Sequence, residues 1–490
     1  MKKKTLVIIL AVVLAVALLA GAAGFALGKR GKTPDTPNTP DTPDEPQTAQ
    51  TDPFHHDDLP NAVDFGIDDG YELTQMLVIS RHNIRSPLSD KSSILGQITP
   101  HEWFAWTSNS GELSVKGGNL ETAMGQFFRK YLESKALIPE NWQPEEGEVR
   151  FYANSLQRTV ATSTFFAAGL LPVADVSIEY HNALGTVDPL FCPIIRCLTP
   201  AFEEQVRAEI DAWGDGEGLV GIGKKLKESF ELLEKVIDFK DSDYAKENGL
   251  EHIPTDDIRI VLAEGAEVSM SGGLRTVCSA VDALKLQLYE EPDLAKALFG
   301  HDVTEEELKK ICESGDVYQD ICEGSKTLAT QVMGPMIAEM KSELMTEGRK
   351  FSYLCGHDST LTALVSALGI KEYELPGSVS CKAPIGAKMV LEKYRGADGK
   401  DYVRLNMCYD TTEQLRNGRS LSEPPMFYGL ELEGLQKKRR RLLRLRRRPR
   451  PLRRRDRPFR RLRRRTDRGV TNNSRIPHLT REKECAILSK

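Results

Sequence analysis

The chain has 490 residues, with 66 Lys and Arg against 71 Asp and Glu, so its formal net charge at pH 7 is −5. This length suffices for about two or three domains with a sizeable core. Segment 437–468 alone carries 20 Lys and Arg against 2 Asp, a local charge of +18, which leaves −23 for the rest. Contacts from Lys and Arg to phosphates dominate nucleic-acid affinity, so the acidic main body excludes a general nucleic-acid binder, and no nucleic-acid partner is expected.

The N-terminal segment 1–32 is predicted to be an export signal. Three lysines precede an apolar run at 5–27, and a second basic cluster follows at 29–32. A cleaved signal peptide usually has an apolar run of about 7–15 residues and a membrane span needs about 20, so the length favours a membrane anchor. Small residues near 20–23 keep cleavage open. We expect an exported protein, either anchored and facing outside the cytoplasm or secreted or periplasmic.

Segment 33–63 is rich in Pro, Thr and Asp and contains repeated Thr-Pro-Asp and Thr-Pro-Asn units. Such a composition buries little apolar surface and stays extended. It predicts a linker between the leader and a globular domain at 64–435. With an uncleaved leader, this linker would hold the domain away from a membrane to which the N-terminus is tethered.

The first chemical motif follows a buried strand predicted at 71–80. Arg81, His82 and Arg85 come at its carboxyl end, where α/β sheets commonly bind ligands. Each guanidinium offers a planar fork of donors for phosphoryl oxygens. An imidazole between them can attack phosphorus or transfer a proton. The motif therefore predicts a phosphate site.

A second junction of the same kind is predicted around Arg158. The strand-like run 148–153 precedes a helix predicted over 154–169, with an Asn or Ser cap and a terminal Gly. Arg158 falls in the first turns of that helix, where unpaired backbone N–H groups and the helix dipole also favour an anion. We expect Arg158 to join the phosphate site.

The third junction contains His357 and Asp358. They follow a short strand at 351–355 and precede a helix at 359–368, whose apolar residues recur at helical spacing and which Gly369 ends. A His-Asp pair alone is common, but here it converges with two earlier strand ends. A carboxyl group at this place can supply a proton to a leaving group.

The remaining segments predict the surroundings of this sheet. Segments 97–147 and 184–331 are predicted to form a helical cap, and 388–394 with 402–409 a hairpin that adds antiparallel strands. Nine cysteines show neither a CxxC nor a Cys/His zinc spacing, so we predict no metal site and no cofactor. In an oxidising compartment, Cys192 with Cys197 and Cys312 with Cys322 are near enough in sequence to pair.

The motifs together resemble the histidine acid phosphatases, which form branch 2 of the histidine phosphatase superfamily, and most closely the bacterial glucose-1-phosphatases and phytase-like enzymes. The resemblance covers about 71–433 and rests on SRHNIRSPL, YANSLQRTVAT, GTVDPLFCPI, GHDS, PIGAKMV and EQLRN. Asn83 stands where most of the broader family has Gly, as in the glucose-1-phosphatase-like members. The family implies an α/β fold with a mixed-sheet, doubly wound core and an inserted helical cap domain.

Carried over residue by residue, the resemblance makes His82 the nucleophile and Asp358 the acid that protonates the leaving alcohol. Arg81, Arg85, Arg158 and His357 would hold the phosphoryl oxygens. Glu267 aligns with a glutamate that helps select the substrate, although a slip in the alignment would exchange it with Glu264. The implied activity is hydrolysis of phosphate monoesters, such as glucose 1-phosphate or phytate, through a phosphohistidine.

Two alternatives remain open at this point. The same cleft would suit a catalytically idle, surface-tethered binding module for phosphorylated ligands, against which the intact His82 and Asp358 speak. The Arg-rich segment 436–490 is predicted to be a disordered tail that departs abruptly from the family pattern. An out-of-frame reading of a GC-rich gene would produce it, and the rival interpretation is a basic arm for nucleic acid or an anionic membrane.

Overall fold

A computed structural model describes residues 53–55, 70–89, 92–434 and 443–444 of the chain. The predicted leader 1–32 lies outside these residues, as do nearly all of the linker and most of the Arg-rich segment 436–490. Within the described ranges, every helix is too short or too polar to span a membrane. In the Arg-rich segment, Leu443–Arg444 forms a two-residue strand paired antiparallel with Tyr402 and Val403, so the prediction of disorder is wrong for these two residues.

The core of the fold is an eight-stranded mixed sheet in the order β10-β8-β7-β1-β6-β2-β3, with β9 paired to β8. β1, β6, β2 and β3 run parallel, whereas the pairs that involve β7 and β8 are antiparallel. The strands are β1 (Tyr71–Arg81), β2 (Val149–Ala153), β3 (Ile178–Glu179), β6 (Phe351–Gly356), β7 (Lys388–Gly396), β8 (Asp401–Tyr409), β9 (Met426–Gly429) and β10 (Leu443–Arg444).

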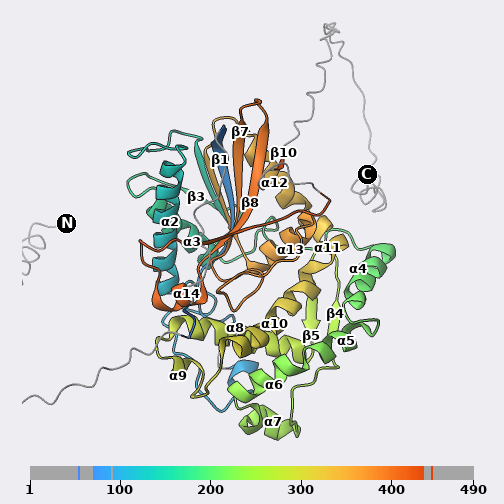
Figure 1. Cartoon of the computed structure of the whole chain (residues 1–490). Coiled ribbons are helices and arrows are strands. Elements are labelled where there is room, and N and C mark those ends of the chain that lie inside the picture. The colour runs from blue at the N-terminus through green and yellow to red at the C-terminus, as the bar shows by residue number, and fades with distance from the viewer. Residues whose placement is uncertain (1–52, 56–69, 90–91, 435–442, 445–490) are drawn as a thin grey trace, which may run out of the picture. The chain divides into compact units, whose positions relative to one another are not determined.

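Both faces of the sheet are covered by helices (Figure 1). The covering helices are α2 (Val115–Ser134), α3 (Gln157–Leu170), α12 (Gly334–Met345) and α13 (Asp358–Leu368). Met76 and Val78 of β1 belong to the apolar core shared with α2 and α3, and Leu77 and Ile79 to the core shared with α12 and α13. Successive strand residues point to opposite faces, so an unbroken apolar run is what a strand covered on both sides requires.

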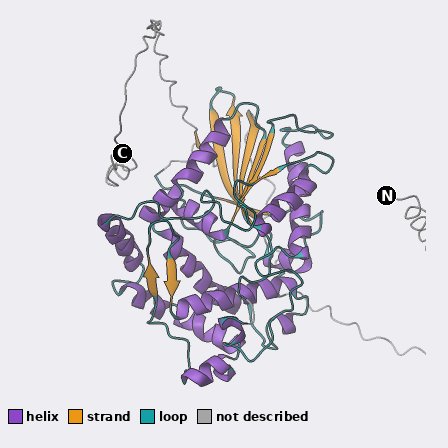
Figure 2. Ribbon diagram, turned by 180° about the vertical axis from the view of Figure 1, so that it is seen from behind, coloured by secondary structure: helices purple, strands orange, loops and turns teal. Residues whose placement is uncertain are grey.

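Between β3 and β6 the chain leaves the sheet and forms a helical cap, in which the small hairpin of β4 and β5 lies among helices (Figure 2). The cap elements are α4 (Pro200–Ala212), α5 (Gly218–Lys225), α6 (Lys227–Val236), η2 (Phe239–Asp241), α7 (Asp243–Asn248), β4 (Arg259–Val261), β5 (Ser269–Ser271), α8 (Gly273–Glu290), α9 (Leu294–Ala297), α10 (Glu305–Gln319), η3 (Asp320–Gly324) and α11 (Lys326–Val332). Two further short helices are η1 (Ile94–Gly96) and α14 (Thr412–Asn417). The predicted fold class, a doubly wound mixed sheet with an inserted helical cap, is confirmed.

The helix α2 corrects one part of this prediction, because it belongs to the sheet layer and not to the cap expected at 97–147. A Cβ on Gly125 would lie 2.1 Å from the carbonyl oxygen of Phe166, and a Cβ on Gly169 would lie 2.1 Å from that of Thr122. Only glycine at both positions lets α2 and α3 approach so closely. Apolar periodicity predicted the helix correctly, but it could not tell which element the helix packs against.

Two local predictions are also wrong. Cys192, Cys312 and Cys322 are free thiols, so neither predicted disulfide forms. The helix expected from Asn154 begins at Gln157, after an N-cap residue, Leu156, that makes no side-chain capping bond. Asn154 instead points its side chain into the site described below.

We predict that Gly169→Ala destabilises the protein by about 1–3 kcal/mol, because its methyl group would overlap backbone atoms of α2 and force the two helices apart. The matched control is Gly334→Ala at the start of α12, where no atom lies within 4 Å of an added Cβ. The free energy of unfolding, measured by urea denaturation, should fall for the first variant alone. Equal stability of the two variants would contradict the close contact between α2 and α3.

Candidate active site

His82 follows directly after β1 and is almost fully buried. Its Nδ1 lies 2.9 Å from the carbonyl oxygen of Asn83. A carbonyl oxygen can only accept, so Nδ1 carries the proton and Nε2 of the neutral ring keeps its lone pair. Burial, followed by the positive charges of Arg158 and Arg85, holds the pKa of His82 well below its usual range. The imidazole is therefore neutral, as a nucleophile must be.

Arg81 and Arg85 are buried beside His82, and each is held by a carboxylate. Nη2 of Arg81 lies 2.9 Å from Oδ2 of Asp358, and Nη2 of Arg85 lies 3.1 Å from Oδ2 of Asp282 on the cap helix α8. Backbone carbonyls accept a further bond from each guanidinium. These contacts fix the planes of both groups and leave their Nε atoms buried without a hydrogen-bond partner among the described residues.

Arg158 reaches the same place from the first turn of α3. It donates from Nη1 to the carbonyl of Gly111 over 3.4 Å, and its Nε is buried without a partner in the described part of the chain. Burial, and then the nearby charge of Arg85, lowers the pKa of Arg158 to about 10. The guanidinium stays charged at neutral pH, and the low value reflects how closely the cations are crowded.

His357 lies opposite His82, with 5.5 Å between the ring centres and 68° between the ring planes. Oδ1 of Asn154 accepts the backbone N–H of Asp188 over 2.7 Å, which turns Nδ2 of Asn154 toward Nε2 of His357 at 2.6 Å. Nε2 of His357 must then accept, so its Nδ1 carries the proton. That Nδ1 is also buried with no partner among the described residues. His357 thus offers one oriented N–H to the site.

Asp358 begins α13 and accepts the N–H of Ser359 over 2.9 Å. Burial alone would raise the pKa of Asp358, but the guanidiniums of Arg81 and Arg85 hold it below its usual range. The carboxyl group is therefore ionised when only protein groups surround it. Its pKa depends on charges that a bound anion would offset.

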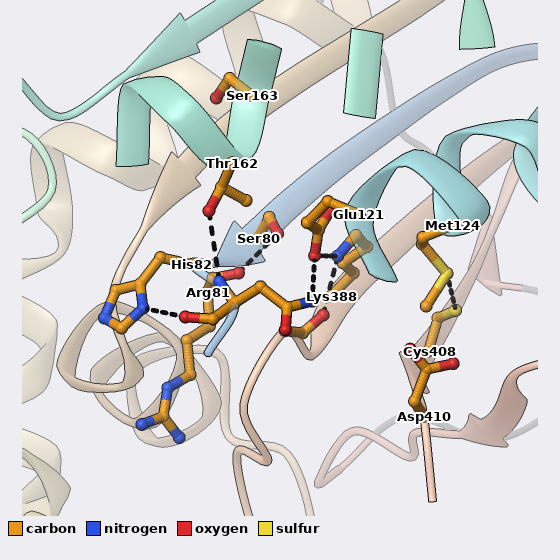
Figure 3. Close-up of polar contacts among 12 residues, drawn as sticks. Ser80, Arg81, His82, Glu121, Met124, Thr162, Ser163, Lys388, Cys408 and Asp410 are labelled. Carbon is orange, nitrogen blue, oxygen red and sulfur yellow. Dashed lines mark hydrogen bonds and ion pairs between the residues drawn. The ribbon is translucent and has the colours of Figure 1, made fainter. Parts of the chain in front are cut away.

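A buried ion pair lies behind the nucleophile. Oε1 of Glu121 accepts from Nδ2 of Asn83 and from Nζ of Lys388, in both cases over 2.8 Å, and both charged side chains are fully buried. Figure 3 shows this pair on one side of the strand end, with the ring of His82 and the guanidinium of Arg81 on the other. The N–H of Asn83 also donates to Thr162 of α3 over 3.2 Å. These bonds fix the backbone that carries His82.

Glu267 and Glu264 were the two alternatives for the glutamate that the family resemblance places near the substrate, and their surroundings differ. Nδ2 of Asn154 donates to Sγ of Cys192 over 3.7 Å, and Glu267 lies near enough to this thiol to raise its pKa, after the larger effect of burial. Glu267 is exposed at the edge of the site, where partial desolvation and then the charge of Asp358 raise its pKa. Glu264 instead accepts the backbone N–H of Leu198 over 3.3 Å.

A cleft with a cavity volume of about 170 Å³ opens between these residues and the cap. Its walls come from the ends of β1 and α13, from the cap helices α8 and α10, and from the loop before β7. The charged lining residues are Arg81, Arg85, Arg275, Asp282, Lys285, Asp316, Asp358 and Lys382. Arg81, Arg85 and Asp358 are thus open to a ligand on the cap side.

Comparisons with known proteins agree with this arrangement. Residues 72–190 match the model of the histidine phosphatase superfamily (branch 2). A glucose-1-phosphatase of Salmonella typhimurium is 34% identical over 372 residues, which is 75% of this chain and 88% of that protein. A glucose-1-phosphatase of Providencia rettgeri is 34% identical over 369 residues, with 74% and 86% covered.

The chain belongs to the histidine phosphatase superfamily, branch 2. The solved phytase of Citrobacter braakii has the same fold, with a TM-score of 0.70 and 24% identity, and the match covers 76% of this chain and 95% of that one. The predicted family is confirmed, and the protein is a histidine acid phosphatase.

All the predicted phosphate-site residues of this phosphatase meet at the carboxyl ends of β1, β2 and β6. Sequence reasoning missed Asn154, which sets the tautomer of His357, and Asp282, which orients Arg85. It also missed the pair of Glu121 and Lys388. The sequence did hold a signal for Asn154, since an amide between a strand end and a predicted helix can hydrogen-bond a site residue as well as cap the helix. The others act through contacts distant in sequence.

The buried histidines should make stability depend on pH. Burial and the charge of Arg158 lower the pKa of His357 to about 3, against about 6.5 in the unfolded chain. Between these values the unfolded state binds more protons, so the folded state loses stability as the pH falls from about 6.5 toward 3. We predict that His357→Gln reduces this slope by up to about 1.4 kcal/mol per pH unit.

Urea denaturation at pH 6.5, 5.5 and 4.5 measures this slope. The control is His252→Gln, because His252 lies at the surface and pairs with Glu234 over 2.7 Å. It should leave the slope as in the parent protein. Parallel curves for the parent and the His357 variant would refute the buried neutral state of His357.

Proposed function

We propose that this phosphatase hydrolyses phosphate monoesters of small hydroxyl-rich compounds, sugar or inositol phosphates, through a phosphohistidine on His82. One observation carries the proposal: a neutral, correctly protonated imidazole faces buried donors of three arginines and a histidine. Buried donors without partners are costly in a folded protein. Phosphoryl oxygens would satisfy those of Arg81, Arg85, Arg158 and His357 together.

In the first step, Nε2 of His82 would attack phosphorus as the bond to the leaving oxygen breaks. The three guanidiniums stabilise the charge on the phosphoryl oxygens in the transition state, and they are already oriented before the substrate binds. The bond from Nδ1 of His82 to the carbonyl of Asn83 stabilises the positive charge that the ring acquires. Water then hydrolyses the phosphohistidine and releases inorganic phosphate.

Asp358 would protonate the leaving oxygen in that first step. In the protein alone its pKa is too low for this role, because Arg81 and Arg85 favour the carboxylate. A phosphoryl group brings a charge of about −2 to the same guanidiniums and offsets their effect, so the pKa of Asp358 rises when substrate binds. Substrate binding would therefore favour the protonated form of Asp358 that the first step needs.

The lining of the cleft favours a substrate with few phosphates. Lys382 is bound to Asp320, and Asp282 stands beside Arg85, so carboxylates pair with two of the cations that line the cleft. These carboxylates would repel the additional phosphate groups of a polyphosphorylated substrate, whereas they would accept hydrogen bonds from hydroxyl groups. This balance supports glucose 1-phosphate over inositol hexakisphosphate as the better substrate.

The predicted leader 1–32 supports the proposal that the phosphatase acts outside the cytoplasm. Its basic start and apolar run at 5–27 are those of an export signal. An exported phosphomonoesterase would release phosphate and an uncharged alcohol from esters that are themselves too polar to cross a membrane unaided.

We predict that His82→Ala abolishes turnover, and that Asp358→Asn slows glucose 1-phosphate at least tenfold more than p-nitrophenyl phosphate. Only the sugar oxygen needs a proton to leave, and a general acid contributes about 10²–10⁴ to the rate. Steady-state kcat on the two substrates measures the difference. Equal losses on both would remove Asp358 from the role of acid.

We predict that Glu267→Gln raises the ratio of kcat/KM for inositol hexakisphosphate over that for glucose 1-phosphate about tenfold, since a neutral amide no longer repels extra phosphates; tenfold corresponds to about 1.4 kcal/mol. Glu264→Gln is the matched control and should leave the ratio unchanged, because Glu264 contacts Leu198 and not the site. An equal effect of the two substitutions would show that neither glutamate selects the substrate.

A further inference from the structure

Two histidines and an aspartate from distant parts of the chain meet in the cap, at a place that takes no part in the phosphatase reaction. His101 lies in the loop after η1, Asp238 is the N-cap residue just before η2, and His301 follows α9. Among the residues that the structure describes, these three are the group whose ligand atoms all lie within 4.8 Å of one another.

The geometry directs both rings at one carboxylate oxygen. Nε2 of His101 lies 2.6 Å and Nε2 of His301 lies 3.0 Å from Oδ2 of Asp238. The side chains are between a quarter and a third exposed, at 30%, 24% and 35% for His101, His301 and Asp238. The cluster is therefore reachable from solvent and leaves room for water as a further ligand.

The surroundings hold the cluster in place. The ring of His101 stacks on Phe299, with 4.8 Å between centres and 7° between planes, and Trp103 meets the same phenyl ring edge-on. Phe299 and Asp238 both have left-handed backbones, at φ 54° and 48°. Such conformations are rare for residues other than Gly, Asn and Asp, and they persist where surrounding contacts enforce them.

Two imidazole nitrogens and one carboxylate oxygen form a donor set suited to a divalent transition metal. Imidazole binds Zn²⁺, Ni²⁺, Cu²⁺ and Fe²⁺ well, and Zn²⁺ accepts mixed nitrogen and oxygen ligands in a tetrahedron. With metal–ligand bonds of about 2.0–2.1 Å, tetrahedral ligand atoms stand roughly 3.3 Å apart. To reach this separation from Oδ2 of Asp238, Nε2 of His101 would move away by about 0.7 Å and Nε2 of His301 by about 0.3 Å.

We propose that His101, Asp238 and His301 bind one Zn²⁺ ion, with water completing the tetrahedron. This ion would connect the loop after η1 to the cap segments that carry Asp238 and His301. The loop leads on to the phosphate site, where Gly111 accepts a bond from Arg158 and Leu113 pairs with Arg85. The ion steadies this loop from outside the site and takes no part in the phosphoryl transfer.

The full chain, treated with a chelator and dialysed, tests the proposal by titration with Zn²⁺ alone in a phosphate-free buffer. Calorimetry should give a site that binds one Zn²⁺ per chain and that His101→Ala or Asp238→Asn weakens at least tenfold. Cobalt(II) in place of zinc should give the visible absorption of a tetrahedral nitrogen and oxygen site. His252→Ala, which removes a surface histidine paired with Glu234, is the matched control and should bind as the parent does.

Thermal unfolding provides the second readout. Zn²⁺ at about one hundred times its dissociation constant for the parent should raise the midpoint of the parent by a few degrees and that of Asp238→Asn by about half as much or less. Asp238→Asn keeps the shape of the side chain, so it covers the case in which His101→Ala fails to fold. Zinc affinity that is the same in the parent and the variants, or no binding below millimolar Zn²⁺, would show that the three residues form only a hydrogen-bonded bridge and would overturn the proposal.

Discussion

The position of every group in the site depends on the register of β6 between β1 and β2. Arg81 pairs with Gly356, and Ala153 pairs with Cys355, so three parallel strands end at one level. The N–H of His82 continues the ladder to the carbonyl of Gly356 over 3.1 Å, and that of Asn154 to the carbonyl of Cys355 over 2.9 Å. A slip of one residue would turn alternate side chains to the opposite face and separate His82 from His357.

This register creates an electrostatic problem that the rest of the site resolves. Three guanidiniums and two imidazoles are buried close together, and the imidazoles stay neutral because neighbouring charges and burial oppose their protonation. Carboxylates at the edge hold two of the arginines, Asp358 on Arg81 and Asp282 on Arg85. A phosphoryl group would offset part of the positive charge of these guanidiniums. Binding of the substrate and protonation of Asp358 are therefore coupled through Arg81.

The sequence predicted that Arg81, His82, Arg85, Arg158, His357 and Asp358 would lie together, because each comes soon after an apolar strand and strand ends of one parallel sheet lie together. It predicted the antiparallel hairpin of β7 and β8 for a similar reason, since the Gly-rich turn and the two strands are adjacent in the chain. The packing of α2 on α3 was missed, because it depends on contact between Gly125 and Gly169, which are 44 positions apart in the sequence.

The cap cluster of His101, Asp238 and His301 and the ion pair of Glu121 and Lys388 could not be predicted for the same reason: their members are far apart in the sequence. His101 and His301 have no zinc-finger spacing, and Asp238 lies between them in an unrelated segment. Glu121 and Lys388 lie far apart in the sequence, yet they form a fully buried ion pair. The predicted disulfides failed because proximity in sequence does not bring two sulfur atoms together in a fold.

The central claim is that the phosphoryl group passes through His82, and trapping the intermediate tests it most directly. The enzyme is mixed rapidly with p-nitrophenyl phosphate, denatured in base, in which phosphohistidine survives, and mapped by mass spectrometry. The account predicts phosphate on His82, up to one per chain, that forms with the burst of p-nitrophenolate. A burst without modified His82, or phosphate on another side chain, would contradict it.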